Sequence, residues 1–209
     1  MKRLFLALLL LFCLAPTAFA EEAMTHIVFR YVSPKIKAGT FSATSRELWR
    51  VGFRYMRLQE QPDPQQHIHG LIIANAPNSW MINLYDNSGQ HILDPGPSID
   101  VHLQLFSSST NQEVLKLEMG HEVAFFKKHK AKTAGQSTLD GISAKLYTLT
   151  LGESRLKLYL RPDGKPFQLM LEEGGESFAI RYELFEENLK PRWELFQLPK
   201  GIKITEAQM

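Results

Sequence analysis

The stretch RLKLYLRPDGKPFQLML, residues 155–171, alternates apolar and polar side chains on either side of a short turn. Leu156, Leu158 and Leu160 fall on one face of its first half, and the basic and polar residues between them fall on the other. Such period-two alternation indicates a half-buried β-strand, and the PDGK sequence at 162–165 is typical of a hairpin loop. The stretch therefore predicts an antiparallel hairpin.

The same alternation continues on both sides of this hairpin, in residues 143–151 and 178–185. Gly152-Glu153 and the EGGE sequence at 173–176 supply the turns between these strands. The C-terminal third thus predicts a β-meander with one apolar and one solvated face.

Further strands are expected towards the N-terminus at 25–32, 70–75 and 80–85, because turn residues recur there at short intervals. Residues 40–59 are interpreted as one long strand with a bulge or bend at Gly52. Residues 99–130 lack this alternation and predict a helical or irregular insert. The expected fold class is mostly β (α+β), in one domain spanning residues 21–209.

The first 20 residues have the composition of a cleavable secretory signal. Lys2 and Arg3 precede an apolar run from Leu4 to Leu14, and Ala18-Phe19-Ala20 provides small residues for a signal peptidase. The alternative is a retained anchor, although the run is shorter than the ~20 apolar residues that a membrane span needs. We expect cleavage after Ala20 and a periplasmic location.

Charge and cysteine content exclude several classes of partner and site. The chain has 24 basic and 22 acidic residues, and removing Lys2 and Arg3 leaves 22 of each. A neutral balance argues against a nucleic-acid partner, which requires a basic surface. The only cysteine, Cys13, lies in the expected signal, so we expect neither a disulfide nor a cysteine-based metal site.

The order of these signals resembles the LolA family of periplasmic lipoprotein carriers. The resemblance covers most of residues 21–209 and is carried by strand and turn patterns. The segments concerned are Leu48-Trp49, 53–59, Gln61-Pro62-Asp63, Leu71-Ile72-Ile73, 80–85, the hairpin at 160–166 and Phe196–Gly201.

The resemblance implies a curved antiparallel half-barrel of the LolA/LolB type, with short helices as a lid over an apolar concavity. The segment Glu113–Lys128 falls where such a lid lies in the family. The family carriers have an arginine in a loop after their Leu-Trp pair that helps control lid opening. That loop is missing here, and Arg50 is the nearest candidate for the role.

The expected lining of the concavity consists of apolar residues on the predicted strands. Trp49, Val51, Phe53 and Tyr55 occupy alternate positions and are therefore expected to share one face. The full set of expected ligand-binding residues is Trp49, Val51, Phe53, Tyr55, Trp80, Leu158, Leu169, Phe178 and Ile180.

Motifs for chemistry are weak in this sequence. It contains no G-x-S-x-G, H-E-x-x-H or G-x-G-x-x-G motif, so no enzyme activity, catalytic residue, metal site or cofactor is expected. His67 and His69, with Asp63 nearby, are either metal ligands or part of a solvated loop. The basic run at Lys127, Lys128, Lys130 and Lys132 is either a solvated face or a surface for anionic head groups or a partner.

The leading hypothesis is a monomeric carrier or chaperone that buries lipoprotein acyl chains, lipids or other apolar ligands without chemistry. Its partners would be those ligands and membrane-bound donor or acceptor proteins. The alternatives are a non-catalytic envelope binding or scaffolding module on the same fold and, with little support, a hydrolase or metal-dependent enzyme. An open apolar cavity distinguishes a carrier from a scaffold with a filled interior.

Overall fold

A computed structural model describes residues 22–94, 96 and 100–207 of the chain. The predicted signal and its cleavage site lie outside these residues, apart from Glu22 just beyond them. No helix in the described ranges is long and apolar enough to cross a membrane. The elements are β1 (Met24–Val32), η1 (Phe41–Ala43), β2 (Arg46–Val51), β3 (Tyr55–Glu60), β4 (Gly70–Asn75), β5 (Asn78–Asn83), β6 (Ser88–Leu93), η2 (Val114–Lys116), α2 (Glu122–Lys128), β7 (Lys132–Leu139), β8 (Ile142–Leu151), β9 (Ser154–Leu160), β10 (Pro166–Glu173), β11 (Glu176–Leu189), η3 (Trp193–Phe196) and β12 (Lys203–Glu206).

All twelve strands belong to one sheet, in the order β12-β6-β5-β4-β3-β2-β1-β11-β10-β9-β8-β7. Every neighbouring pair is antiparallel except β12 and β6, which run parallel. The N-terminal strand β1 therefore lies near the middle, where it pairs with β2 on one side and with the long β11 on the other. The predicted meander corresponds to β8–β11.

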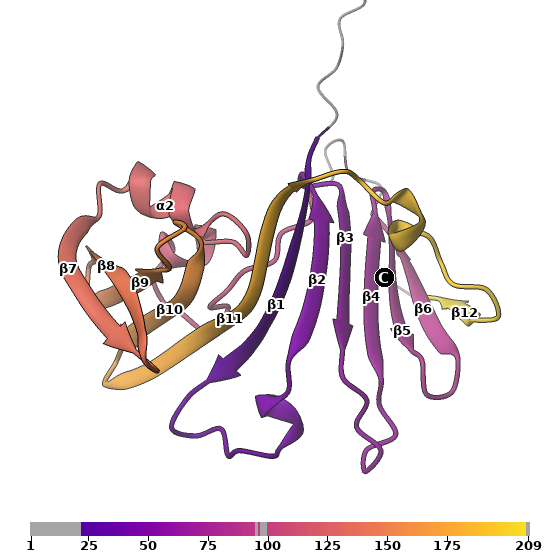
Figure 1. The fold of residues 1–209 in the computed structure, drawn as a ribbon. Coiled ribbons are helices and arrows are strands. Elements are labelled where there is room, and N and C mark those ends of the chain that lie inside the picture. The colour runs from indigo at the N-terminus through magenta and orange to yellow at the C-terminus, as the bar shows by residue number, and fades with distance from the viewer. Residues whose placement is uncertain (1–21, 95, 97–99, 208–209) are drawn as a thin grey trace, which may run out of the picture.

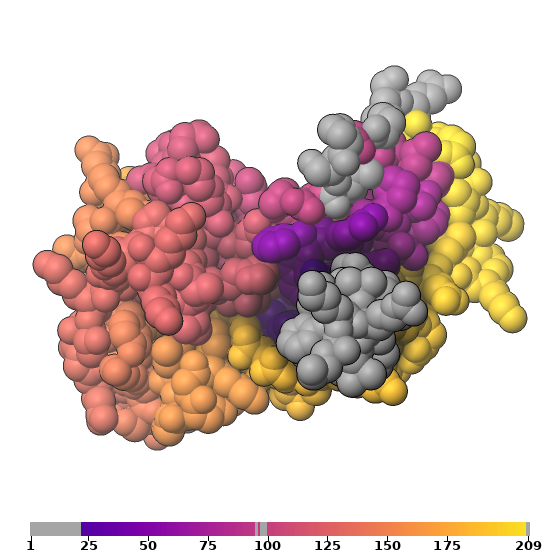
Figure 2. Space-filling view, turned by 90° about the horizontal axis from the view of Figure 1, so that it is seen from above, coloured from indigo at the N-terminus to yellow at the C-terminus, as the bar shows by residue number. Residues whose placement is uncertain are grey.

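The sheet is strongly curved, and its two ends curve differently (Figure 1). Strands β7–β10 curl towards α2, whereas β2–β6 form a flatter part. Seen from above, the insert between β6 and β7 (pink) lies against the β7–β10 end, and the C-terminal residues (yellow) lie at the other end (Figure 2). The prediction of a mostly β, curved half-barrel with short helices on its inner side is confirmed.

The inner face of the sheet and the insert share the main hydrophobic core. Phe126 and Leu117 of the insert belong to one cluster with Ile27, Leu48 and Leu158 of the sheet, and all five are buried. Large aliphatic and aromatic side chains removed from water each stabilise the fold by about 1.5–3 kcal/mol. The insert is therefore a structural part of the core and does not merely rest on it.

The outer face of the flatter part is covered by the C-terminal segment. Phe196 of η3 is buried against Met24 and Val51, with Tyr55 packed beside them. The sequence predicted an extended segment from Phe196 to Ile204, but only its end is extended, in β12.

The structure corrects the prediction of one long strand at 40–59. Gly52 has a φ of +53°, and the chain reverses between Val51 and Tyr55, which pair with each other. A left-handed conformation costs glycine little, so the residue interpreted as a bulge instead permits a tight β2–β3 hairpin.

Candidate ligand-binding site

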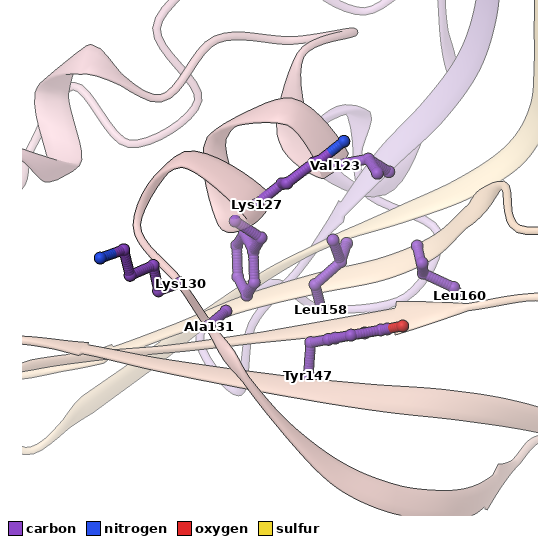
Figure 3. A pocket seen from close by; sticks show the side chains of 8 residues that line it. Val123, Lys127, Lys130, Ala131, Tyr147, Leu158 and Leu160 are labelled. Carbon is purple, nitrogen blue, oxygen red and sulfur yellow. The ribbon is translucent and has the colours of Figure 1, made fainter.

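An apolar pocket lies between α2 and the inner face of β8 and β9, with a volume of about 330 Å³. This volume is at the lower end of the range for small-molecule sites, which are typically lined by hydrophobic and aromatic side chains. Figure 3 shows side chains from the helix facing those from the strands across it. The lining residues are Val123, Phe126, Lys127, Lys130, Ala131, Tyr147, Leu158 and Leu160.

Strand alternation builds one wall of this pocket. Leu158 and Leu160 are two positions apart on β9 and point to the same side, and Tyr147 of β8 pairs directly with Leu158. Both leucines are buried. Figure 3 shows the Tyr147 ring lying along the pocket, with its hydroxyl directed to the side on which Leu160 lies.

Helical spacing builds the opposite wall. Val123, Phe126, Lys127 and Lys130 are three or four residues apart, so they share one side of α2 and its C-terminal turn. Val123 remains 42% exposed although it is apolar, which marks it as part of the pocket entrance. The Lys127 ammonium group lies beside it in Figure 3, while that of Lys130 points away on the other side.

A second cavity of about 450 Å³ adjoins the first, because Tyr147 and Leu160 line both. Its other lining residues are mostly polar: Gln136, Ser143, Lys145, Arg161, Pro162 and Gly164. The two cavities together give the inner surface of β8 and β9 an apolar end and a polar end.

The insert is attached to the sheet by a buried arginine. The Arg50 guanidinium, 5% exposed, donates a hydrogen bond to the Met119 carbonyl (2.7 Å) and another to the Gly52 carbonyl (3.1 Å). It also lies 3.7 Å from the Glu118 carboxylate. Arg50, the candidate for lid control, therefore connects β2 to the lid, while its role in opening stays a prediction.

A second buried polar contact secures the start of α2. The Glu122 carboxyl accepts hydrogen bonds from the Tyr182 hydroxyl (2.7 Å) and the Gly120 amide (2.8 Å). Burial raises the pKa of Glu122 to about 7 and raises that of Tyr182 well above its usual value. The other Glu122 carboxyl oxygen is buried and has no hydrogen-bond partner in the described part of the chain.

The structure separates the nine predicted lining residues into three groups. Leu158 lines the apolar pocket, and Leu169, Phe178 and Ile180 belong to or pack against the same inner core. Contact of these residues with a ligand stays a prediction.

The other five are not on the inner face. Trp49, Val51, Tyr55 and Trp80 point to the outer face, in clusters covered by η3 and residues near the C-terminus. Phe53 stands in the β2–β3 turn, where it stacks on His121 with ring centroids 5.0 Å apart. The expectation that these residues line the concavity is therefore wrong.

The sequence did not identify the helical wall as a binding surface. The expected lid at Glu113–Lys128 includes α2, and the spacing of Val123, Phe126 and Lys127 was available as a signal. Ala131 and Tyr147 carry no signal of their own, because only the packing of α2 against β8 brings them together.

The predicted histidine pair lies in an exposed loop. His67 packs near the Tyr85 ring, and His69 contacts the Gln59 side chain. The Asp63 carboxylate accepts hydrogen bonds from the amides of Gln65 and Gln66. Among the described residues, no group of three or more potential ligands is arranged to hold a metal ion.

No protein-family model and no curated protein matches the sequence. Similar solved structures include an uncharacterised conserved protein from Thermus thermophilus, with 10% identity, 90% of this chain and 92% of that chain covered, and a TM-score of 0.49. A LolA superfamily protein from Nitrosomonas europaea shares 12% identity over 86% of this chain and 92% of its own, with a TM-score of 0.33. Lipoprotein LppX from Mycobacterium tuberculosis shares 10% identity over 81% of this chain and 88% of its own, with a TM-score of 0.40.

The family resemblance drawn from the sequence is matched by the LolA superfamily protein among these structures. Likenesses at these identities and TM-scores carry no argument about function. The functional argument therefore rests on the residues of this chain.

Proposed function

We propose that this protein is a periplasmic carrier or chaperone that binds an acyl chain or another apolar ligand between α2 and strands β8–β9, without chemistry. The observation that supports this most directly is the apolar pocket, whose walls are the buried Leu158 and Leu160 on one side and Phe126 and Val123 on the other. Acyl chains of lipoproteins or lipids are its ligands, and membrane-bound proteins donate or accept them. It acts as a monomer after cleavage behind Ala20.

Burial alone supplies enough free energy for such a role. Each methylene removed from water contributes about 0.8 kcal/mol, so a chain of ten contributes roughly 8 kcal/mol before the costs of association. A gross figure of this size corresponds to micromolar affinity, which permits both capture and release.

A second candidate, a non-catalytic scaffolding module, is favoured by a specific observation. Side chains of the insert, including Leu117 and Phe126, fill much of the inner face as core. A module that only binds other proteins needs no further cavity. The two functions differ in whether the pocket of about 330 Å³ takes up a ligand.

Val123→Asp tests the proposal at the pocket entrance. Because Val123 is 42% exposed, the fold tolerates a carboxylate there, but an acyl chain entering the pocket would have to desolvate it. We expect at least tenfold weaker binding of an apolar fluorescent probe, with an unchanged circular dichroism spectrum.

The matched control is Ala124→Asp, since Ala124 is the next residue on α2 and lies outside this pocket. It should bind the probe as the parent does. If the parent protein binds no probe and lipid extraction yields no bound lipid, the scaffold is the better description. If both variants bind normally, the ligand lies elsewhere.

A further inference from the structure

We infer that the ligand is a single-chain amphiphile with an anionic head group, its chain in the apolar pocket and its head group in the adjoining polar cavity. This inference rests on the proposed function and adds the chemical class of the ligand. The cavities, about 330 and 450 Å³, meet at Tyr147 and Leu160, so one molecule can occupy both. A purely apolar ligand would leave the polar cavity unused.

The sign of the head group follows from the charges around the two cavities. Lys127 and Lys130 border the apolar pocket, Lys145 and Arg161 border the polar cavity, and neither cavity has an acidic lining residue. The lysines that form ion pairs in the described ranges are Lys35, Lys116 and Lys157, all outside both cavities. The positive charges at the cavities are thus not neutralised by carboxylate partners.

Lys145 is placed where the two cavities join. It pairs across the strands with Leu160, and its ammonium nitrogen lies 5.0 Å from the centroid of the Tyr147 ring. An anion beside Tyr147 would therefore meet a lysine that an aromatic face already orients. Ser143, two residues earlier on β8, adds a hydroxyl to the same cavity.

Arg161 supplies a fixed positive charge at the far side of the polar cavity. Its guanidinium donates hydrogen bonds to the carbonyls of Tyr182 (3.0 Å) and Glu183 (3.3 Å) and lies over the Phe167 ring. The neighbouring acid Asp140 pairs with Arg181, at 2.8 Å. The cavity therefore keeps a net positive environment, to which an arginine held in place contributes.

The experiment compares amphiphiles that share a dodecyl chain: dodecanoate, dodecyl phosphate, dodecanol and dodecyltrimethylammonium. Binding to the full-length exported protein is measured by calorimetry or by displacement of an apolar fluorescent probe. We expect the anions to bind about tenfold more tightly than the alcohol, the effect of one or two charge-assisted hydrogen bonds, and the cation most weakly. Dodecanoate and dodecyl phosphate distinguish a fatty acid from a phosphate-bearing lipid as the source of the anion.

Lys145→Gln should remove most of the preference for anions and leave dodecanol binding unchanged. The matched control is Lys132→Gln, which removes the same charge from an exposed lysine that lines neither cavity. It should keep the preference.

Equal binding of dodecanoate and dodecanol to the parent would overturn the inference and leave the proposed function standing. Binding of none of the four compounds would overturn both. A preference that survives in Lys145→Gln but is lost in Lys127→Gln would also overturn it, because the head group would then lie at the α2 entrance and not in the polar cavity.

Discussion

Glu122 is a carboxyl group held inside the junction between the lid and the sheet. Burial raises its pKa from about 4.5 to about 7, in spite of the hydrogen bonds from Tyr182 and Gly120. In the unfolded chain the group ionises near its ordinary value. Since the folded-state pKa is the higher one, the contribution of this group to stability is fully present below about pH 4.5 and is lost as the pH rises through about 7.

We predict that Glu122→Gln reduces the pH dependence of stability. The parent should lose on the order of 3 kcal/mol between pH 4.5 and pH 7 through this group alone. Glutamine retains an acceptor for Tyr182 and Gly120 but does not titrate. Urea unfolding at pH 5 and pH 8 measures the difference, and parallel losses in parent and variant would contradict the assignment.

At this scale the sequence predicts strand residues better than the direction in which they point. Trp49, Val51 and Tyr55 do share a face, as alternation requires. The neighbouring Leu48 and Met56 are equally apolar and are buried on the other face. With both faces covered, hydrophobicity does not distinguish inside from outside, so assignment of these aromatics to the concavity had no physical basis in the pattern.

The insert as an element depends on Arg50 for its attachment to β2. Arg50→Met keeps most of the side-chain volume but leaves the Met119 carbonyl without its donor and the Glu118 carboxylate, 12% exposed, without its nearest cation. Breaking a buried pair in this way typically costs 3–5 kcal/mol.

We predict that Arg50→Met increases hydrogen exchange in residues 101–131 far more than in β8–β10. Mass spectrometry of exchanged peptides measures this. An equal increase throughout the sheet would show that Arg50 supports the whole fold and does not act as a specific attachment of the lid.

The C-terminal element η3 stabilises the outer face and should be independent of the ligand. Phe196 is 1% exposed and packs on Tyr55 at a centroid distance of 5.7 Å. Phe196→Ala should therefore destabilise the protein by about 3–5 kcal/mol, measured by urea unfolding. At a temperature where the variant is folded, its affinity for an apolar probe should equal that of the parent. Weaker binding by the folded variant would place the ligand on the outer face.

Among the elements, the β8–β11 meander could be predicted from the sequence because local alternation and turn residues define it. The apolar pocket could not, since its second wall comes from α2, seven residues in a segment without strand alternation. Only the burial of Phe125 and Phe126 against the sheet fixes which side of α2 faces Tyr147 and Leu158.

The molecule as a whole is stabilised without covalent cross-links. Its only cysteine is Cys13, and the described residues contain none. We predict that thermal unfolding curves with and without reductant coincide. A lower midpoint in reductant would reveal a disulfide between two copies of the chain through Cys13 and would contradict removal of residues 1–20.

The position of β1 near the centre of the sheet has a consequence for how the chain folds. Its partner β11 begins at Glu176, so the strand pair that joins the two ends of the sheet closes a loop of about 150 residues. Contacts so distant in sequence make folding slow, because loop-closure entropy is lost before the pairing compensates for it. A chain emerging from a ribosome or a translocation channel N-terminus first therefore exposes one edge of β1 until almost the entire sequence is available. During that interval it is a substrate for holding chaperones, and chains terminated before residue 176 should remain protease-sensitive however long they are given to fold.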